Sequence, residues 1–408
     1  MMSTGRVVLQ PYMVERHPAY RAQLDILREL SPSITVNAVF PDDDVEHERW
    51  APRYSGIRRV VRYAAAQMHG YRLSRQRIDR HYVVGDFAPR MHFLLSTPRV
   101  HVDADDPLNL YAGIGRGQVD GAHCRRVALK LLAAMRAGTL TLSFWTEAQL
   151  RNFAATLHPS EAVPLLERGA LRAIPPCIQT WPVQAQIGRS EALRCLMIAT
   201  GGKFWHKGVA DAMTAVHRVN QRGHAVSLTV VADSVPDAWR EFASRHAYYR
   251  LVGRLERAEL DALFLQHDVL VFPSHHDSYG WVIVEGKARG LPAIATDFYT
   301  RPEIVRHGED GLLIADPFNN PFLPIAPLAY AEGFMTPDGS GGISVSPLIE
   351  PYVESLVDAL ARCHHDRVLL RSMGQQAYLS TAADGRFGRA ARLAVLRELL
   401  LVPATRGT

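Results

Sequence analysis

Short apolar runs alternate along the chain with longer segments of helical periodicity. In the second half, the runs that predict buried strands are LRCLMIAT (193–200), VSLTVVA (226–232), VLVFPS (269–274) and LPAIATD (291–297). In the first half, weaker runs predict strands at 6–10, 33–40, 81–85, 99–103 and 139–143. Helical patterns such as 122–136, 208–222 and 258–267 separate them. This alternation is typical of parallel sheets made of βαβ units, so we expect an α/β fold.

The length predicts more than one domain. A single core stops growing at roughly 250–300 residues, and this chain has 408. We place the boundary in Pro175–Arg189, which carries three prolines and no acidic residue, and expect domains at 1–182 and 183–375, followed by a C-terminal segment at 376–408. Residues 317–349 hold most of a proline-rich stretch with a GSGGIS run and little periodicity, which indicates an inserted loop.

Composition excludes several classes of protein. Apolar residues make up 47% of the chain, and it contains no apolar run of 18 or more residues, as a spanning helix requires. The first fifteen residues lack the apolar region of a secretory signal. The four cysteines lie far apart without a CxxC pair, which favours buried thiols in a reducing compartment over disulfides or structural zinc. We therefore expect a cytoplasmic protein.

The segment ATGGKFWHKGVADAM (199–213) joins a predicted strand to a predicted helix through a glycine turn and two lysines. Backbone amides at a helix N-terminus can cradle phosphate, and a lysine adds positive charge. The segment lacks the GxxxxGK[ST] spacing of a P-loop. Taken alone, it fits a phosphate-binding loop or an ordinary strand-to-helix loop with surface lysines.

The segment FPSHHDSYGWVIVEGKARGLPAIATD (272–297) places two acids, Asp277 and Glu285, eight residues apart on either side of Gly280. By propensity YGWVIVE is a strand, whereas a functional interpretation begins a helix near Gly280. Glycine lets a ligand approach the backbone, and amides at the helix start face its phosphates. A carboxylate one to two turns later suits hydrogen bonding to a ribose diol.

These residues carry a resemblance to a known family. Residues 193–316 resemble the donor domain of the retaining family 4 glycosyltransferases of GT-B architecture. The features that carry the resemblance are, in order, the Lys207-Gly208 loop, the VGRLERAELDALFLQHDVLVFPS stretch, the acids Asp277 and Glu285 with seven residues between them, GLPAIATD and PEIVRHGEDGLLI. It implies two Rossmann-like domains facing an interdomain cleft, with the last helix crossing back to the first domain. Residues 1–180 resemble the acceptor domain only in outline.

The resemblance also implies roles for individual residues. Lys207 would contact the donor diphosphate, Asp277 the transferred sugar and Glu285 the nucleotide ribose, with Tyr279, Gly280 and Trp281 contacting sugar and phosphate through the backbone. The family usually has Glu where this chain has Asp277, and Arg where it has Gly202. We expect amides near Gly202 and the neighbouring Lys203 to take over the arginine's share of donor binding.

The expected activity is transfer of a sugar from a nucleotide-diphosphate sugar to an acceptor hydroxyl with retention of configuration. No cofactor or metal is required, and the product belongs to glycan, polysaccharide or glycolipid biosynthesis. Two alternatives stay open at this point. A nucleotide-sugar epimerase would need no acceptor, and a catalytically inactive binding protein would hold the nucleotide without turnover.

The HVDADDP segment and two histidine pairs can each be interpreted in two ways. In HVDADDP, after a predicted strand, His101, Asp103, Asp105 and Asp106 are acceptor-side candidates, or else belong to a solvated acidic turn before a proline. The pairs His275-His276 and His364-His365 suggest metal at first sight. Adjacent side chains point in different directions on a strand or helix, so we expect no chelation by either pair and no metal site.

The excess positive charge lies in the first half. Residues 1–180 hold 23 basic and 17 acidic residues, whereas the remainder holds 23 and 24. Between residues 56 and 81, seven arginines, among them Arg58, Arg59 and Arg62, alternate with apolar residues. Such a stretch predicts reversible attachment to an anionic membrane surface, or equally a solvated helix face paired with Asp42–Asp44 and Glu46 upstream. No nucleic-acid motif is present.

Overall fold

The computed structural model describes residues 5–9, 34–38, 81–84, 100–107, 121–199, 204–317 and 334–401, together with residues 23, 25–27, 29, 30 and 110. The chain divides into two compact units. One comprises Met1–Cys177 and Arg389–Thr408, and the other Ile178–Gly388. The chain therefore changes unit at 177/178 and again at 388/389.

The first unit is a parallel α/β structure. A four-stranded sheet runs in chain order through β3 (His81–Val84), β4 (Val100–Ala104), β5 (Leu140–Phe144) and β6 (Leu171–Ala173). Two further strands, β1 (Gly5–Leu9) and β2 (Ile34–Ala38), pair in parallel. The helices among the described residues of this unit include α6 (Gly121–Arg136), α7 (Glu147–Ala155), α8 (Pro159–Glu167) and the C-terminal α16 (Arg389–Leu401). Thr146 caps α7: its hydroxyl accepts from the Gln149 backbone amide.

The second unit contains a six-stranded parallel sheet in the order β12-β11-β10-β7-β8-β9. Its strands are β7 (Leu193–Ala199), β8 (Val226–Ala232), β9 (Tyr249–Val252), β10 (Val269–Phe272), β11 (Ala293–Asp297) and β12 (Gly311–Ala315). The central strands are almost fully buried and rich in Val, Ile and Leu, as expected for strands covered on both faces. Numbered from β7, this is the doubly wound order 3-2-1-4-5-6.

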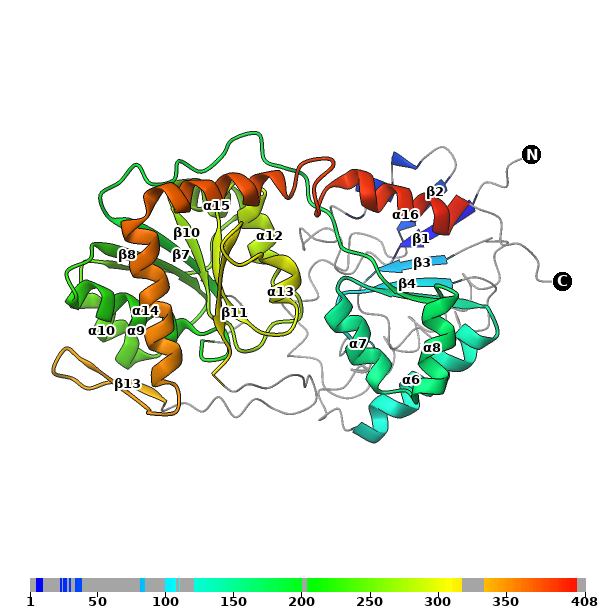
Figure 1. Cartoon of the computed structure of the whole chain (residues 1–408), viewed down its shortest axis with the longest axis horizontal. Helices are drawn as coiled ribbons and strands as arrows, with labels where there is room; N and C mark the ends of the chain where they lie inside the picture. Colours follow the sequence, from blue (N-terminus) through cyan, green and yellow to red (C-terminus); the bar gives the residue numbers. More distant parts are fainter. Residues whose placement is uncertain are drawn as a thin grey trace, which may run out of the picture. The chain divides into compact units, whose positions relative to one another are not determined.

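Helices cover both faces of this sheet. Figure 1 shows α9 (Val209–Gln221), α10 (Asp237–Ser244) and α14 (Glu350–His365) on one side and α12 (Trp281–Lys287) and α13 (Arg301–Ile304) on the other. The remaining helices are α11 (Arg257–Gln266) and α15 (Arg367–Leu379). Apolar residues of β7, β8, α9 and α14 form one continuous core. The sequence left YGWVIVE open between strand and helix; the structure makes it helical from Trp281.

The expected inserted loop is partly structured. Within the described part of 317–349, β13 (Met335–Pro337) and β14 (Ile343–Val345) form an antiparallel hairpin. The Asp338 carboxylate accepts from the amides of Ser340 and Gly342 and so closes the glycine-rich turn. Met335 is buried, and its sulfur accepts from the Thr214 hydroxyl of α9 at 3.2 Å. Residues 335–345 of the expected insertion therefore form a hairpin, and the glycines and polar residues of the run form its turn.

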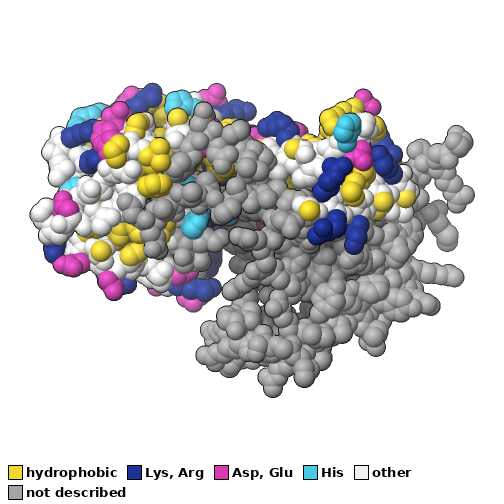
Figure 2. Space-filling model, turned by 90° about the horizontal axis from the view of Figure 1, so that it is seen from below, with side chains coloured by type: hydrophobic (Ala, Val, Ile, Leu, Met, Phe, Trp, Pro, Cys, Tyr) yellow, Lys and Arg dark blue, Asp and Glu magenta, His cyan; other side chains and the backbone are white. Residues whose placement is uncertain are grey.

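Some predicted features lie outside the described residues. These are Gly202 and Lys203, the basic stretch with Arg58, Arg59 and Arg62, and residues 318–333. Among the described residues, no helix combines the length and the apolar character needed to cross a bilayer. On the face drawn in Figure 2, basic and acidic side chains are interspersed over the described residues.

Candidate functional site

The strand order of the second unit singles out one edge of its sheet. The neighbours β7 and β10 are the strands from which the chain winds in opposite directions. In open α/β sheets, ligands bind outside the carboxyl ends of the strands at such a switch point. The loops that leave these two ends are 200–208 and 273–280, and they carry Lys207 and Asp277.

Gly208 brings these two loops together. It precedes α9 in the left-handed conformation, with φ 73°. A Cβ at this position would lie 2.1 Å from the carbonyl oxygen of Pro273, so only glycine fits. The KG pair is thus a structural requirement as well as a candidate binding motif, because the glycine sets the backbone that places Lys207 beside the second loop.

Lys207 forms an ion pair with Asp277 across the two loops. Its ammonium also lies 5.9 Å from the centre of the Phe272 ring at the end of β10. The other carboxylate oxygen of Asp277 accepts from the backbone amides of Gly280 at 2.8 Å and Tyr279 at 3.2 Å. One carboxylate therefore organises both the lysine and the start of α12.

The surroundings keep Asp277 ionised. Burial raises the pKa of this carboxyl, but Lys207, Arg301 and the amide of Gly280 lower it more, and the resulting pKa is about 2. Asp277 is consequently an anion throughout the physiological pH range. It can orient a hydroxyl or balance a cation, but it has no proton to donate.

Arg301 was not among the residues predicted from the sequence, and its side chain contacts the loop that carries Asp277. Its guanidinium is fully buried and donates to the carbonyl oxygens of Ser274 at 2.9 Å and Asp277 at 3.3 Å. Burial lowers its pKa. One signal was present in the sequence: a basic residue at the N-terminal end of a helix opposes the helix dipole, so other contacts must hold it there.

Glu285 lies in α12, five residues after Gly280, and is buried. Arg257, at the start of α11, forms an ion pair with its Oε1. Arg257 also bonds Asp261 at 2.7 Å, and Arg289 joins Asp261 at 2.5 Å to the main-chain carbonyl of Glu285 at 2.8 Å. This cluster was not predicted from the sequence, and its members come from α11, from α12 and from the turn after α12. Gly280, at φ 90°, starts α12, and Tyr279 and Trp281 beside it are buried.

The acceptor-side candidates of the first unit divide into two groups. Asp103, on β4, is fully buried and accepts from Tyr82 Oη at 2.7 Å, from Ser143 Oγ at 2.9 Å and from the guanidinium of Arg392. His101 contacts Thr141 Oγ1 at 2.8 Å and Ser143 Oγ at 3.0 Å. These two side chains form an internal polar cluster that binds α16 to the sheet.

Burial is the main cause that lowers the pKa of His101, to about 4, so its imidazole is neutral at pH 7. Asp105 and Asp106 follow the carboxyl end of β4. Asp106 is buried, whereas Asp105 is half-buried and its carbonyl accepts from Gln149 Nε2. An acceptor-orienting role remains a prediction for all four candidates. By position, Asp105 is the one whose side chain solvent reaches.

Part of the second unit matches a known family of proteins. Residues 194–320 match the family described as Glycosyl transferases group 1. This range contains Lys207, Asp277 and Glu285. It begins one residue inside β7 and ends beyond β12, so it covers the six strands of the sheet.

Two curated relatives match part of the chain. The glycogen synthase of Mycobacterium tuberculosis is 30% identical over 139 residues, which are 33% of each chain. The phosphatidyl-myo-inositol mannosyltransferase of the same species is 33% identical over 125 residues, 30% of this chain and 32% of the relative. The similarity thus spans about a third of the length of these relatives.

Solved structures match over nearly the whole chain. The Anabaena protein HepE in complex with UDP and glucose is 14% identical, with a TM-score of 0.60 over 98% of this chain and 99% of its own. At this identity the likeness establishes the fold alone. The predicted GT-B fold class, built of two Rossmann-like α/β units, is confirmed.

Proposed function

Since residues 194–320 belong to the group 1 glycosyl transferases, we propose that this protein transfers a sugar from a nucleotide-diphosphate sugar to an acceptor hydroxyl with retention of configuration. The observation that supports this most strongly is the meeting of Lys207 and Asp277 at the switch point of the second unit, with Glu285 one turn into the helix that follows. A cation for phosphate, an anion for sugar hydroxyls and a carboxylate for ribose are the groups that such a donor needs.

Lys207 is assigned to the donor diphosphate. In the ligand-free protein its charge is balanced by Asp277, and an incoming diphosphate offers a stronger anion. During the reaction the bond between the anomeric carbon and the diphosphate oxygen breaks, and negative charge grows on that oxygen. A fixed ammonium there stabilises the transition state more than the ground state.

The proton of the acceptor hydroxyl needs a base on the same face of the sugar. We assign it to the departing diphosphate, which takes the proton while the acceptor oxygen bonds to the anomeric carbon from the side that the diphosphate leaves. Asp277 supports this assignment indirectly, since a carboxyl whose pKa is about 2 stays ionised and cannot protonate the leaving group. Its role is to orient the sugar hydroxyls.

Glu285 is assigned to the ribose diol of the donor nucleotide. Arg257 holds its Oε1, so Oε2 is the oxygen that accepts from the ribose. Arg257 itself is half-exposed. The cluster of Arg257, Asp261 and Arg289 fixes the carboxylate in advance, which reduces the entropic cost of binding.

The acceptor is proposed to be a sugar or a lipid-linked glycan at the cytoplasmic face of a membrane. One relative is named a phosphatidyl-myo-inositol mannosyltransferase, which acts on a lipid by that name. The arginine-rich stretch with Arg58, Arg59 and Arg62 suits attachment to anionic lipid. The product would belong to glycan, polysaccharide or glycolipid biosynthesis.

The test is turnover of UDP-, GDP-, ADP- and dTDP-sugars with a panel of sugar and glycolipid acceptors, followed by NMR of the anomeric proton. The proposal predicts release of the nucleoside diphosphate with a new glycosidic bond of the donor's configuration. An inverted product would refute retention. Epimerised sugar nucleotide formed without acceptor would replace the proposal with epimerisation, and nucleotide binding without any turnover would make the protein an inactive binder.

A further inference from the structure

Three histidines from separate parts of the second unit meet away from the donor-site residues. His224 stands in the turn between α9 and β8, and His364 and His365 are the last two residues of α14. One ring nitrogen of each lies within 4.8 Å of the other two. The ring centres of His224 and His365 are 4.6 Å apart, and those of His224 and His364 are 5.6 Å apart.

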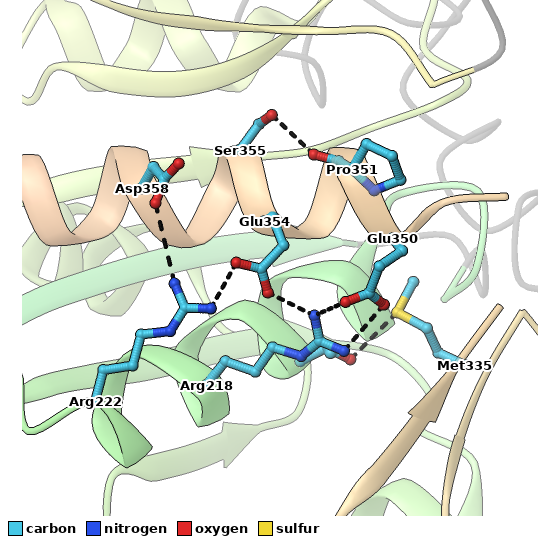
Figure 3. A network of polar contacts seen from close by, with 9 residues as sticks. Arg218, Arg222, Met335, Glu350, Pro351, Glu354, Ser355 and Asp358 are labelled. Carbon is cyan, nitrogen blue, oxygen red and sulfur yellow. Dashed lines mark hydrogen bonds and ion pairs between the residues drawn. The ribbon is translucent and has the colours of Figure 1, made fainter. Parts of the chain in front are cut away.

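An ion-pair network sets the spacing of the two helices that carry these rings. Figure 3 shows Arg218 and Arg222 of α9 reaching Glu350, Glu354 and Asp358 of α14. Arg218 bonds Glu350 at 2.5 Å and Glu354 at 2.7 Å, and Arg222 bonds Glu354 at 2.5 Å. The acids recur every four residues, so they form one stripe along α14. His365 lies seven residues after Asp358 and so falls on the same face of α14. His224 lies two residues after Arg222, just beyond the end of α9.

The backbone on the α9 side is also fixed. The Asn220 side chain donates to the carbonyls of Val216 at 2.7 Å and Val226 at 2.8 Å, and it accepts from the Val226 amide at 3.3 Å. These three bonds clamp the turn from α9 into β8. His224 therefore projects from a constrained backbone, and its ring meets the end of α14 with little loss of conformational freedom.

His364 provides a second observation. Its Nδ1 is buried and has no hydrogen-bond partner within the part of the chain that the structure describes. A buried nitrogen without a partner carries a desolvation cost that a ligand could remove.

We propose that His224, His364 and His365 bind a first-row divalent transition metal ion, with Zn²⁺ as the representative. Neutral imidazoles suit zinc, copper and nickel, whereas Mg²⁺ and Ca²⁺ prefer oxygen ligands. Three protein ligands leave a fourth position of a tetrahedral zinc for water. Zn–N bonds of about 2.0–2.1 Å require the nitrogens to approach one another by roughly 1–1.5 Å, which side chains open to solvent on one side can do.

The proposed site differs from the expectation that the His364-His365 pair does not bind metal. Adjacency argues against chelation by two neighbours alone, but the third ligand comes from another element, and His365 ends its helix. A bound ion would bridge the end of α9 to the junction of α14 and α15. The proposal does not depend on the sugar-transfer activity, because none of its residues belongs to the donor site.

The test is a Zn²⁺ competition titration against a chromophoric chelator, with the full chain prepared without a histidine tag. Wild type is compared with His224→Asn and His365→Asn. The matched control is His158→Asn, which also removes an exposed imidazole but keeps the N-cap of α8, where asparagine is a favoured residue.

We expect wild type and His158→Asn to bind one Zn²⁺ equally tightly, and the two site variants to bind it at least about 10-fold more weakly. Zn²⁺ should also raise the thermal unfolding midpoint of wild type and of the control, but not of the site variants. Equal zinc affinity and equal midpoint shifts in all four proteins would overturn the proposal. Midpoints measured without zinc show that the variants are folded.

Discussion

In the proposed mechanism, the charge of Lys207 acts on the chemical step. Replacement by alanine removes the ammonium that pairs with Asp277, and the donor diphosphate would lose its cation. Because charge on the leaving oxygen peaks in the transition state, Lys207→Ala should lower kcat by about 10²–10³-fold and raise KM much less. Steady-state kinetics with the best donor measures both.

The control for this prediction is Lys130→Ala, which removes an exposed lysine of α6 in the first unit. Its kinetics should equal those of wild type. Full turnover in Lys207→Ala would exclude the diphosphate role. If Lys203→Ala were then the damaging change, the neighbouring lysine would carry that role instead.

Individual residues show where sequence reasoning succeeds and where it ends. Lys207, Gly208, Asp277, Gly280 and Glu285 stand in a linear motif, and the structure brings the two loops of that motif together. Arg301 contacts Asp277 and Arg257 contacts Glu285 from positions 24 and 28 residues away in the sequence. Pairings of this kind depend on how helices pack on the sheet, so no spacing rule reveals them. Asp103 was predicted from the sequence as an acceptor-side candidate. In the structure, its buried carboxylate forms an ion pair with Arg392 of α16.

At the scale of elements, the junction of α9 with the loop after β10 depends on Gly208. Gly208→Ala places a Cβ 2.1 Å from the Pro273 carbonyl in a backbone with φ 73°. Left-handed backbone costs an L-residue about 1–2 kcal/mol, and a steric clash adds roughly 1–3 kcal/mol. We therefore expect a loss of about 2–5 kcal/mol in the free energy of unfolding, measured in urea.

Gly223 offers a matched control for this substitution. It also has a positive φ, 86°, but a Cβ there would meet no atom within 4 Å. Gly223→Ala should therefore cost only the backbone part, about 1–2 kcal/mol. Equal losses for the two substitutions would show that the close approach to Pro273 has no energetic weight.

The elements themselves were largely predictable. Runs of Val, Ile and Leu bounded by glycine or polar turns identified β7, β8, β10 and β11, because buried parallel strands need continuous apolar sequence. The hairpin of β13 and β14 was missed because three-residue strands are too short for a period of two to show. The strand order also lay beyond the sequence, since many orders satisfy the same apolar runs.

At the scale of the whole molecule, the end of the chain belongs to the first unit. Arg392 of α16 is buried and donates to the carbonyls of Ile174 at 2.8 Å and Pro175 at 3.0 Å, besides its ion pair with Asp103. Arg392→Met leaves the Asp103 carboxylate buried without its cation. Breaking one partner of a buried pair costs about 3–5 kcal/mol, so hydrogen exchange of the β3–β5 amides should accelerate by about 10²–10⁴-fold.

The control is Arg397→Met, an exposed arginine on the same helix, which should leave exchange unchanged. The double variant Arg392→Met with Asp103→Asn should recover part of the loss, because it removes the uncompensated charge. Should Arg392→Met exchange as slowly as Arg397→Met, α16 would contribute little to the first unit.

The charge distribution leads to a prediction about membranes. Each basic residue near an anionic surface contributes about 1 kcal/mol, and seven arginines lie between residues 56 and 81. We expect the protein to sediment with vesicles in proportion to their anionic lipid, less at high salt, and less when Arg58, Arg59 and Arg62 become glutamine. In the control variant, Arg218, Arg222 and Arg362 of the second unit become glutamine. No sedimentation at low salt would indicate a soluble acceptor.

Nucleotide binding at the second unit tests the central claim most directly. The measurement is the thermal unfolding midpoint of wild type, Glu285→Gln and the exposed control Glu309→Gln in UDP, GDP, ADP and dTDP. A ligand at 100 times its Kd adds about 2.7 kcal/mol, which for a chain of this size is a shift of roughly 5–10 °C.

The account predicts that one nucleotide shifts wild type and Glu309→Gln by this amount. It should shift Glu285→Gln much less, because loss of a charge-assisted ribose contact weakens binding by roughly 10- to 150-fold, equivalent to about 1.5–3 kcal/mol. A panel in which no nucleotide shifts wild type, or in which Glu285→Gln shifts as far as the control, would contradict the account.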